Sequence, residues 1–310
     1  MGNCFFVDQG LSLDIAELED LLLFYEQNYS YLDEYTNSTL PEPCHDHYCS
    51  VFEDHVPAFL ITLSILGLLS NVALGVALAK FPRLWDQHGP SKTVLSLMTV
   101  AAGIFAVSLP AFAVEWRFGD TFCKTAHVMR YGALFAQGLS VAGNSCLLLR
   151  ASPSWLFPMA LWLVGFLFSV PTAMISNSGD GKWAVCALSS EAKLYPWSMA
   201  HTIICLADFL LLPVFLGLAK LTSRCCECNR RPHIDLTWLF YLFWAPYGVA
   251  MILKTLVQEQ LLRPSCHLQE ALNYFLGLSE GLGMLHCALC PLFLMGEAIC
   301  HQKTARAGKR

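Results

Sequence analysis

Charged residues are scarce in this chain. Asp, Glu, Lys and Arg make up 14% of its 310 residues and hydrophobic residues make up 55%, whereas a soluble globular domain carries about 25% charged residues. The mean hydropathy is +0.48. This composition excludes an ordinary soluble domain and indicates a membrane protein.

Lys and Arg are absent from residues 1–55, although this segment contains twelve of the 24 acidic residues. It also holds two N-glycosylation sequons, at Asn28 and Asn37. Twelve of the 19 Lys and Arg lie in one alternating set of connections and in the C-terminal tail, which the positive-inside rule assigns to the cytoplasm. We therefore expect a plasma-membrane protein with an extracellular N-terminus and a cytoplasmic C-terminus.

Long apolar runs account for most of the chain, and each is long enough to cross a bilayer as a helix. Segments of about ten residues with alternating polarity, which a membrane barrel needs, are missing. The sequence predicts an all-α membrane protein, a bundle of seven transmembrane helices, with an acidic tail at 1–55, a helical domain at 56–295 and a short cytoplasmic tail at 296–310. The seven apolar runs are 56–79, 93–114, 131–149, 155–176, 194–219, 236–253 and 271–295.

Several of the 14 cysteines lie outside or at the outer membrane boundary, where oxidising conditions favour disulfides, among them Cys44, Cys49, Cys123, Cys186 and Cys266. Cys123 opens the third span and Cys186 lies in the loop before the fifth, so a bridge would hold that loop over the mouth of the bundle. Either Cys44 or Cys49 could pair with Cys266 and tie the tail to the loop before the seventh span. Sequence alone does not decide which one pairs.

The hexapeptide HCALCP, residues 286–291, suggests a redox dithiol or half of a zinc site, because Cys287 and Cys290 form a CxxC pair beside His286. It lies inside the predicted seventh span and has no second ligand pair. We therefore expect no metal, cofactor or catalytic residue there. Cys300, on the predicted cytoplasmic side, is a candidate for lipidation.

Two stretches carry a resemblance to a known family. EWRFGDTFCK (115–124) and SEGLGMLHCALCP (279–291) resemble the motifs of chemokine receptors before the third helix and in the seventh. FAQGLSVAG (135–143) and ICHQKTAR (299–306) resemble atypical chemokine receptors of the Duffy antigen type. The resemblance implies a rhodopsin-like fold. It also implies a receptor that binds inflammatory chemokines of several classes and clears, transports or stores them, with passage through endosomes, without driving G proteins.

The chain departs from signalling receptors where those carry polar switch residues. The Asp-Arg-Tyr position falls on three leucines at 147–149, the sodium-binding Asp of the second span is Ala102, the Asn of the seventh-span Asn-Pro motif is Cys290, and the fifth-span Tyr is Leu221. A switch needs two states with different contacts. Productive G-protein coupling is therefore not expected.

The acidic tail suits a basic protein ligand such as a chemokine, because complementary charge raises the rate of encounter. Tyrosines within acidic surroundings are candidates for sulfation, and the alternative is an acidic disordered tail with unmodified tyrosines. The residues expected to contact ligand here are Tyr25, Tyr31, Asp33, Glu34 and Tyr35.

Two charged residues within the spans are further candidates. By resemblance, Glu280 matches the ligand-contacting Glu of the seventh helix, and Arg130 is expected to face the same cavity from the third. They could instead form an ion pair with a purely structural role, because an intramembrane carboxylate is usually functional or paired. Asp208, in the fifth span, fits polar packing as well as a ligand contact.

Two rival classes remain from sequence. One is a conventional G-protein-coupled chemokine receptor. The other is a membrane enzyme or transporter, which would need clustered intramembrane carboxylates or histidines, whereas Asp208, Glu280, His201 and His286 are scattered along the chain. We expect a non-enzyme whose partners are chemokines and the lipid bilayer, with no nucleic acid.

Overall fold

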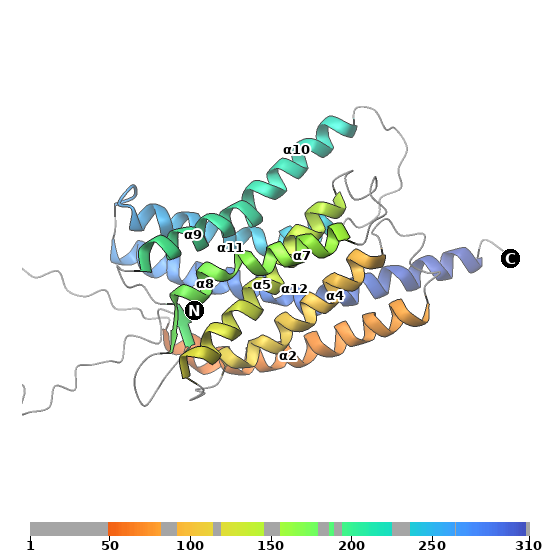
Figure 1. Cartoon of the computed structure of the whole chain (residues 1–310), viewed down its shortest axis with the longest axis horizontal. Helices are drawn as coiled ribbons and strands as arrows, with labels where there is room; N and C mark the ends of the chain where they lie inside the picture. Colours follow the sequence, from red (N-terminus) through yellow and green to blue (C-terminus); the bar gives the residue numbers. More distant parts are fainter. Residues whose placement is uncertain are drawn as a thin grey trace, which may run out of the picture.

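The computed structural model describes residues 49–81, 92–113, 119–145, 156–178, 186–188, 194–224, 236–263 and 265–307. Their helices run side by side along the long axis of an elongated bundle (Figure 1). A small hairpin of β1 (Ser176–Ser178) and β2 (Cys186–Leu188) lies at one end, called here the hairpin end. The end toward which the C-terminus runs is called the opposite end.

The described residues form seven helical columns, one for each predicted apolar run, so the predicted seven-helix membrane fold is confirmed. Six columns are long and apolar enough to cross a membrane. The columns are α2 (Cys49–Lys80); α4 (Lys92–Ser108) with the 3-10 turn η3 (Leu109–Phe112); α5 (Gly119–Ser145); α7 (Leu156–Phe168) with α8 (Val170–Ile175); α9 (Tyr195–Leu206), the π-helical turn η5 (Ala207–Leu211) and α10 (Leu212–Arg224); α11 (Leu236–Gln258); and α12 (Cys266–Ala307).

The remaining column, α5, is the least apolar because it lies at the centre of the bundle. It packs against α4, α7, α8, α10 and α11. Nine consecutive residues, 130–138, are buried, so every face of this stretch meets protein rather than lipid. A helix surrounded by other helices can carry polar groups that find partners there, and it needs small residues for close approach. Gly132, Ala133, Ala136 and Gly138 provide that close approach.

Prolines explain two interruptions of the columns. Pro171 follows the break between α7 and α8, where the Ser169 hydroxyl donates to Phe166 O at 2.6 Å. Pro213 follows η5 directly. Because it has no N–H, Pro213 cannot make the helical bond to Phe209 O, and the backbone widens into a π-turn just before it.

The hairpin is attached to the central helix. β1 and β2 pair antiparallel, with Ser176 opposite Leu188 and Ser178 opposite Cys186. Cys186 forms a disulfide with Cys123, near the start of α5. The strand pair is therefore fastened over the hairpin end of the bundle, close to the first turns of α5.

The helices extend beyond the apolar runs that predicted them. Helix α5 begins at Gly119 rather than 131, α2 begins at Cys49, and α12 continues from Cys266 to Ala307. Hydropathy marks only the part of a helix inside hydrocarbon. Helix α12 has 42 residues and therefore spans about 63 Å at about 1.5 Å per residue. This is roughly twice the hydrocarbon thickness. The two strands were not predicted either.

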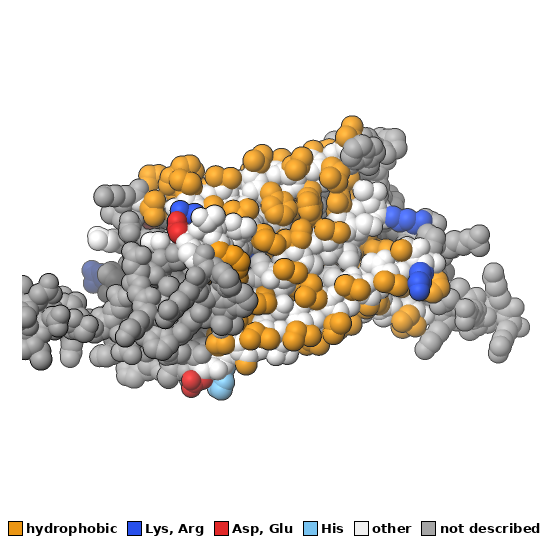
Figure 2. Space-filling model, turned by 60° about the horizontal axis from the view of Figure 1, so that its bottom comes forward, with side chains coloured by type: hydrophobic (Ala, Val, Ile, Leu, Met, Phe, Trp, Pro, Cys, Tyr) orange, Lys and Arg blue, Asp and Glu red, His pale blue; other side chains and the backbone are white. Residues whose placement is uncertain are grey.

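The surface agrees with a membrane protein. In Figure 2 hydrophobic side chains cover the middle of the visible face, and the charged side chains lie toward the two ends. Leucines such as Leu69, Leu163 and Leu242 are strongly exposed along the middle of the columns. In water such a surface would favour aggregation, whereas in a bilayer it faces lipid chains.

The α5–α7 contact gives a test of this packing. A Cβ built on Gly165 would lie 2.5 Å from Ala136 Cα, closer than real Cβ atoms approach, whereas one on Gly103 meets nothing within 4 Å. We expect Gly165→Ala to lower the free energy of unfolding by about 1–3 kcal/mol because it forces the helices apart. Gly103→Ala is the control and should leave stability unchanged or raise it. Thermal unfolding of the detergent-purified protein measures both, and equal melting temperatures for the two variants would contradict the packing.

Candidate functional site

A buried ion pair joins α5 to α12 on the hairpin half of the bundle. A guanidinium N–H of Arg130 donates to Glu280 Oε1, and the two side chains are only 7% and 11% exposed. The two residues are 150 positions apart in sequence. An unpaired charge in such surroundings would be costly, so each side chain fixes the position of the other helix.

Aromatic and sulfur-containing side chains surround the Arg130 guanidinium. Its Cζ lies 4.8 Å from the centroid of the Phe112 ring and 5.8 Å from that of Tyr131. Met284 Sδ, one turn after Glu280 on α12, is 3.9 Å from the guanidinium. Ring faces attract cations most strongly where water is excluded. These contacts hold the cation against α12 and shield the pair from lipid.

Polar side chains from three further helices continue the cluster. His201 of α9 shares a 2.8 Å hydrogen bond with the Thr172 hydroxyl of α8 and lies edge-on to Tyr131, with 4.8 Å between ring centroids. The Tyr131 hydroxyl is 3.5 Å from that of Tyr247 on α11. Lys254, also on α11, is within electrostatic range of Glu280. The hairpin half therefore contains a connected set of polar side chains centred on one ion pair.

The structure brings together two of the predicted ligand contacts, Arg130 and Glu280, and leaves the others undescribed. Cys266 is disulfide-bonded, and its partner lies outside the described side chains. Cys300 is exposed on α12. The predicted residues Tyr25, Asn28, Tyr31, Asp33, Glu34, Tyr35, Asn37 and Cys44 lie outside the described residues, as do the three leucines at 147–149.

Sequence reasoning missed part of the polar cluster. It treated His201 as one of several scattered groups, and it did not select His127. His127 is buried and packs edge-on against Phe112, with 4.8 Å between ring centroids. His127, Arg130 and Tyr131 are spaced three and four residues apart, so they share one helix face. That spacing could have revealed the cluster.

Asp208 lies deep in the bundle rather than in this cluster. It belongs to η5, is buried, and neither carboxylate oxygen has a hydrogen-bond partner among the described residues. The carboxyl group packs on the backbone of α5 at Gly138, where a Cβ would lie 2.6 Å from Oδ1. Only glycine leaves room for it at this position.

The opposite half of the bundle contains the positions at which the sequence departs from signalling receptors. The Asn71 side-chain amide donates to Gly67 O and to Cys287 O, both at 2.8 Å, and thereby joins α2 to α12. Cys290 is buried, as is Ala102 on α4. Around these positions a thiol and a methyl group stand where a signalling receptor would carry an amide and a carboxylate.

The described residues contain one group of three close side chains with metal-ligand chemistry, Cys123, His127 and Cys186. Both sulfur atoms of this group belong to the same disulfide. A disulfide sulfur is not a thiolate, and the thiolate is the form that binds metals. The group is therefore explained as a bridge beside a buried histidine.

The comparisons with known proteins agree with the fold and the motifs. No protein-family model matches the chain. Atypical chemokine receptor 1 of Papio hamadryas is 31% identical over 302 residues, which cover 92% of this chain and 86% of that protein.

Two further relatives cover even more of the chain. Atypical chemokine receptor 1 of Bos taurus is 29% identical over 318 residues, covering 98% of this chain and 93% of that protein. That of Homo sapiens is 29% identical over 322 residues with the same coverage. These relatives are receptors by name, and the resemblance inferred from the motifs is confirmed. The chain belongs to the atypical chemokine receptor 1 family.

Proposed function

We propose that this protein is an atypical chemokine receptor. It binds inflammatory chemokines of several classes and acts as a decoy, sink or transporter without activating G proteins. The observation that carries the proposal is the similarity to relatives named atypical chemokine receptor 1 over 92–98% of the chain. The buried polar cluster at the hairpin end and the apolar replacements in the opposite half support its two parts, ligand binding and absence of signalling.

The proposed topology places the hairpin end outside the cell. The tail at 1–55 is then extracellular, with glycans on Asn28 and Asn37, and the end of α12 is cytoplasmic, with Cys300 as a lipidation site. Cys266 would pair with Cys44 or Cys49 and hold the tail beside the first turn of α12. The receptor resides in the plasma membrane and carries bound ligand through endosomes.

The tail acts as the first contact for the ligand. Residues 1–55 carry a formal charge of −12, whereas the rest of the chain carries +7. A basic chemokine is attracted over about 8 Å at physiological salt, which raises the association rate more than the final affinity. Sulfation of Tyr25, Tyr31 or Tyr35, beside Asp33 and Glu34, would add acidic groups to this collecting surface.

The ligand makes its second contact with the protein at the Arg130–Glu280 pair, inside the hairpin end of the bundle. A basic group of the ligand, entering between the helices at the hairpin end, would compete with Arg130 for the carboxylate of Glu280. Exchange of one cation for another keeps Glu280 paired throughout, which avoids the cost of an uncompensated intramembrane charge. The aromatic rings around Arg130 would accept the displaced guanidinium.

The residues of the opposite half support the proposed absence of signalling. A ligand shifts an equilibrium only by its different affinity for two states. At Ala102 and Cys290 the chain has no group that could exchange one strong hydrogen bond for another. Asn71 joins α2 to α12 through a hydrogen bond to Cys287 O, and in the proposed function ligand binding at the hairpin end favours no second packed state.

Deletion of residues 1–43 tests the collecting role of the tail and retains Cys44. We expect labelled chemokines of several classes to bind the full chain, and the deletion to lower their association rates about tenfold or more because electrostatic steering is lost. Surface plasmon resonance at two salt concentrations measures this effect. Tyr25→Phe, Tyr31→Phe and Tyr35→Phe together form the matched control that keeps the acids. Narrow binding to one class, or an unchanged association rate, would count against the proposal.

Paired substitutions separate a ligand contact from a structural role at the ion pair. Glu280→Leu leaves Arg130 buried without its carboxylate and should cost about 3–5 kcal/mol of stability, whereas adding Arg130→Met removes both charges and should restore it. We expect the double variant to remain folded but to bind chemokine at least about tenfold more weakly, since a charged hydrogen bond contributes about 1.5–3 kcal/mol.

Asp120→Asn serves as the control for this experiment. It breaks the exposed Asp120–Lys124 pair, whose closest atoms are 2.5 Å apart, and should change stability by less than about 1 kcal/mol. Thermal unfolding and equilibrium binding are measured on the same preparations. Wild-type affinity in the folded double variant would assign the ion pair to structure alone.

Transfected cells test the absence of signalling. We expect saturable chemokine binding at the surface together with no change in cAMP or intracellular calcium, because Ala102 and Cys290 stand where a signalling receptor carries the carboxylate and the amide of its switch. A conventional chemokine receptor expressed to the same surface density provides the positive control. A chemokine-dependent calcium or cAMP response would replace this proposal with that of a conventional signalling receptor.

A further inference from the structure

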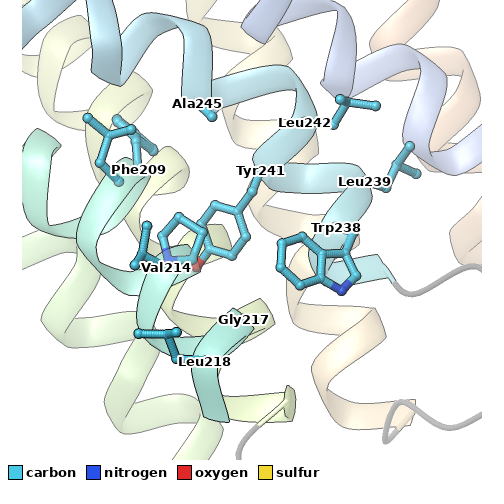
Figure 3. Close-up of a pocket in the computed structure, with 11 residues that line it drawn as sticks. Phe209, Val214, Gly217, Leu218, Trp238, Leu239, Tyr241, Leu242 and Ala245 are labelled. Atoms are coloured by element: carbon cyan, nitrogen blue, oxygen red, sulfur yellow. The ribbon is translucent and has the colours of Figure 1, made fainter. Parts of the chain in front are cut away.

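A groove of about 730 Å³ lies between the fifth column and the sixth. Neither Arg130 nor Glu280 is among the residues that line it. Val214 and Gly217 of α10 line one wall, and Trp238, Tyr241 and Ala245 of α11 line the other. Figure 3 shows the Trp238 and Tyr241 rings directed from α11 toward α10. Its volume lies within the range of about 300–1,000 Å³ typical of small-ligand sites.

The divergence of two helices creates this groove. Helix α11 packs closely on η5, where a Cβ on Gly248 would lie 2.8 Å from Leu210 Cγ. Beyond the π-turn and Pro213, α10 leaves the bundle toward the opposite end (Figure 1). Gly217 adds no side chain to fill the space, and a Cβ there would lie 3.2 Å from Trp238 Cη2. The groove is therefore open because of the π-turn, Pro213 and Gly217.

The groove opens to the lipid phase. All of its lining residues lie in two membrane-spanning segments, Tyr195–Ala219 and Trp238–Gln258. Val214 and Leu242 on its rim are 59% and 69% exposed. Away from its Trp238 end the groove faces hydrocarbon, and its lining residues are almost all apolar, so a polar solute would lose water there without gaining partners. The occupant must therefore be a component of the bilayer.

The shape and lining favour a rigid planar occupant over a flexible chain. The wall on α11 presents the flat Trp238 ring, which is 46% exposed, with the buried Tyr241 ring behind it, and Gly217 adds no side chain to the wall on α10. A flexible acyl chain loses conformational freedom when it settles in a compact groove, whereas a fused-ring molecule has little to lose. We propose that the groove is a sterol site, which takes one membrane sterol from the leaflet at the opposite end.

The position of Trp238 gives the sterol an orientation. This residue lies two positions after the start of α11, at the end of the span, where tryptophan rings sit at the membrane–water boundary. A sterol carries its single hydroxyl at the same depth and its rings below it. The hydroxyl would therefore lie beside Trp238, and the ring system would extend past Tyr241 toward Ala245.

A photoactivatable, alkyne-bearing cholesterol analogue tests this site on the full chain in membranes. After irradiation, we expect peptides from α10 and α11 to carry most of the label, and excess cholesterol to compete. Val214→Trp fills the groove and should reduce that labelling by about tenfold, equivalent to about 1.4 kcal/mol of binding free energy. Leu242→Trp, on the other rim, is an independent second variant. Both variants are compared only as monodisperse protein.

Leu163→Trp is the matched control, because Leu163 is 61% exposed on α7, outside the groove, against 59% for Val214. It should change labelling by less than about twofold. Label spread evenly over the lipid-facing helices would overturn the proposal. Equal labelling of the groove by a photoactivatable phosphatidylcholine would assign it to acyl chains. Disulfide crosslinking of Leu242→Cys between copies, with the sterol probe excluded, would assign it to a second copy of the chain.

Discussion

The hydrocarbon interior of a membrane offers polar groups no water, so charged side chains there need partners within the protein. The Arg130–Glu280 pair meets this requirement between α5 and α12. Each charge stabilises the other, and loss of either one would leave a buried charge without this partner. The pair therefore fixes α5 against α12, which are distant in sequence. Phe112, Tyr131 and Met284 complete the enclosure around the cation. The central position of α5 follows, because a helix that carries an arginine at this depth must be surrounded by protein.

The same constraint explains how much of the protein could be predicted. Apolar runs reveal membrane spans because lipid-facing residues have no alternative, and the columns were found from them. Helix α5 was the hardest to delimit, since residues 119–130 include Asp120, Lys124, His127 and Arg130 and its buried stretch contacts protein. Arg130 and Glu280 could be proposed as partners from the family motifs. His127 could have been added to them, because it shares one helix face with Arg130. His201 could not, because its neighbours Thr172 and Tyr131 lie on other columns and only folding brings them together.

Asp208 shows where pattern-based reasoning ends. Sequence places an acid in the middle of a span, and charge alone suggests a partner or a ligand. The structure instead places it in a π-turn that Pro213 causes, with its carboxyl group against the bare backbone of Gly138. Neither feature is visible as a local pattern, because the turn depends on backbone hydrogen bonding and the glycine lies on another helix. The lateral groove has the same origin in the same turn.

The two halves of the bundle together suggest why a receptor could lose its switch and keep its ligand. Apparent affinity falls by the fraction of molecules in the binding-competent state, so a protein that exchanges between states binds more weakly than its competent form. The proposed function assumes that Ala102 and Cys290 in place of polar switch groups, with Asn71 joining α2 to α12, favour one packed state. In the proposed function that state is the binding one, and no part of the binding energy is spent on a conformational change. A sink for chemokines gains from this arrangement, because its task ends with capture.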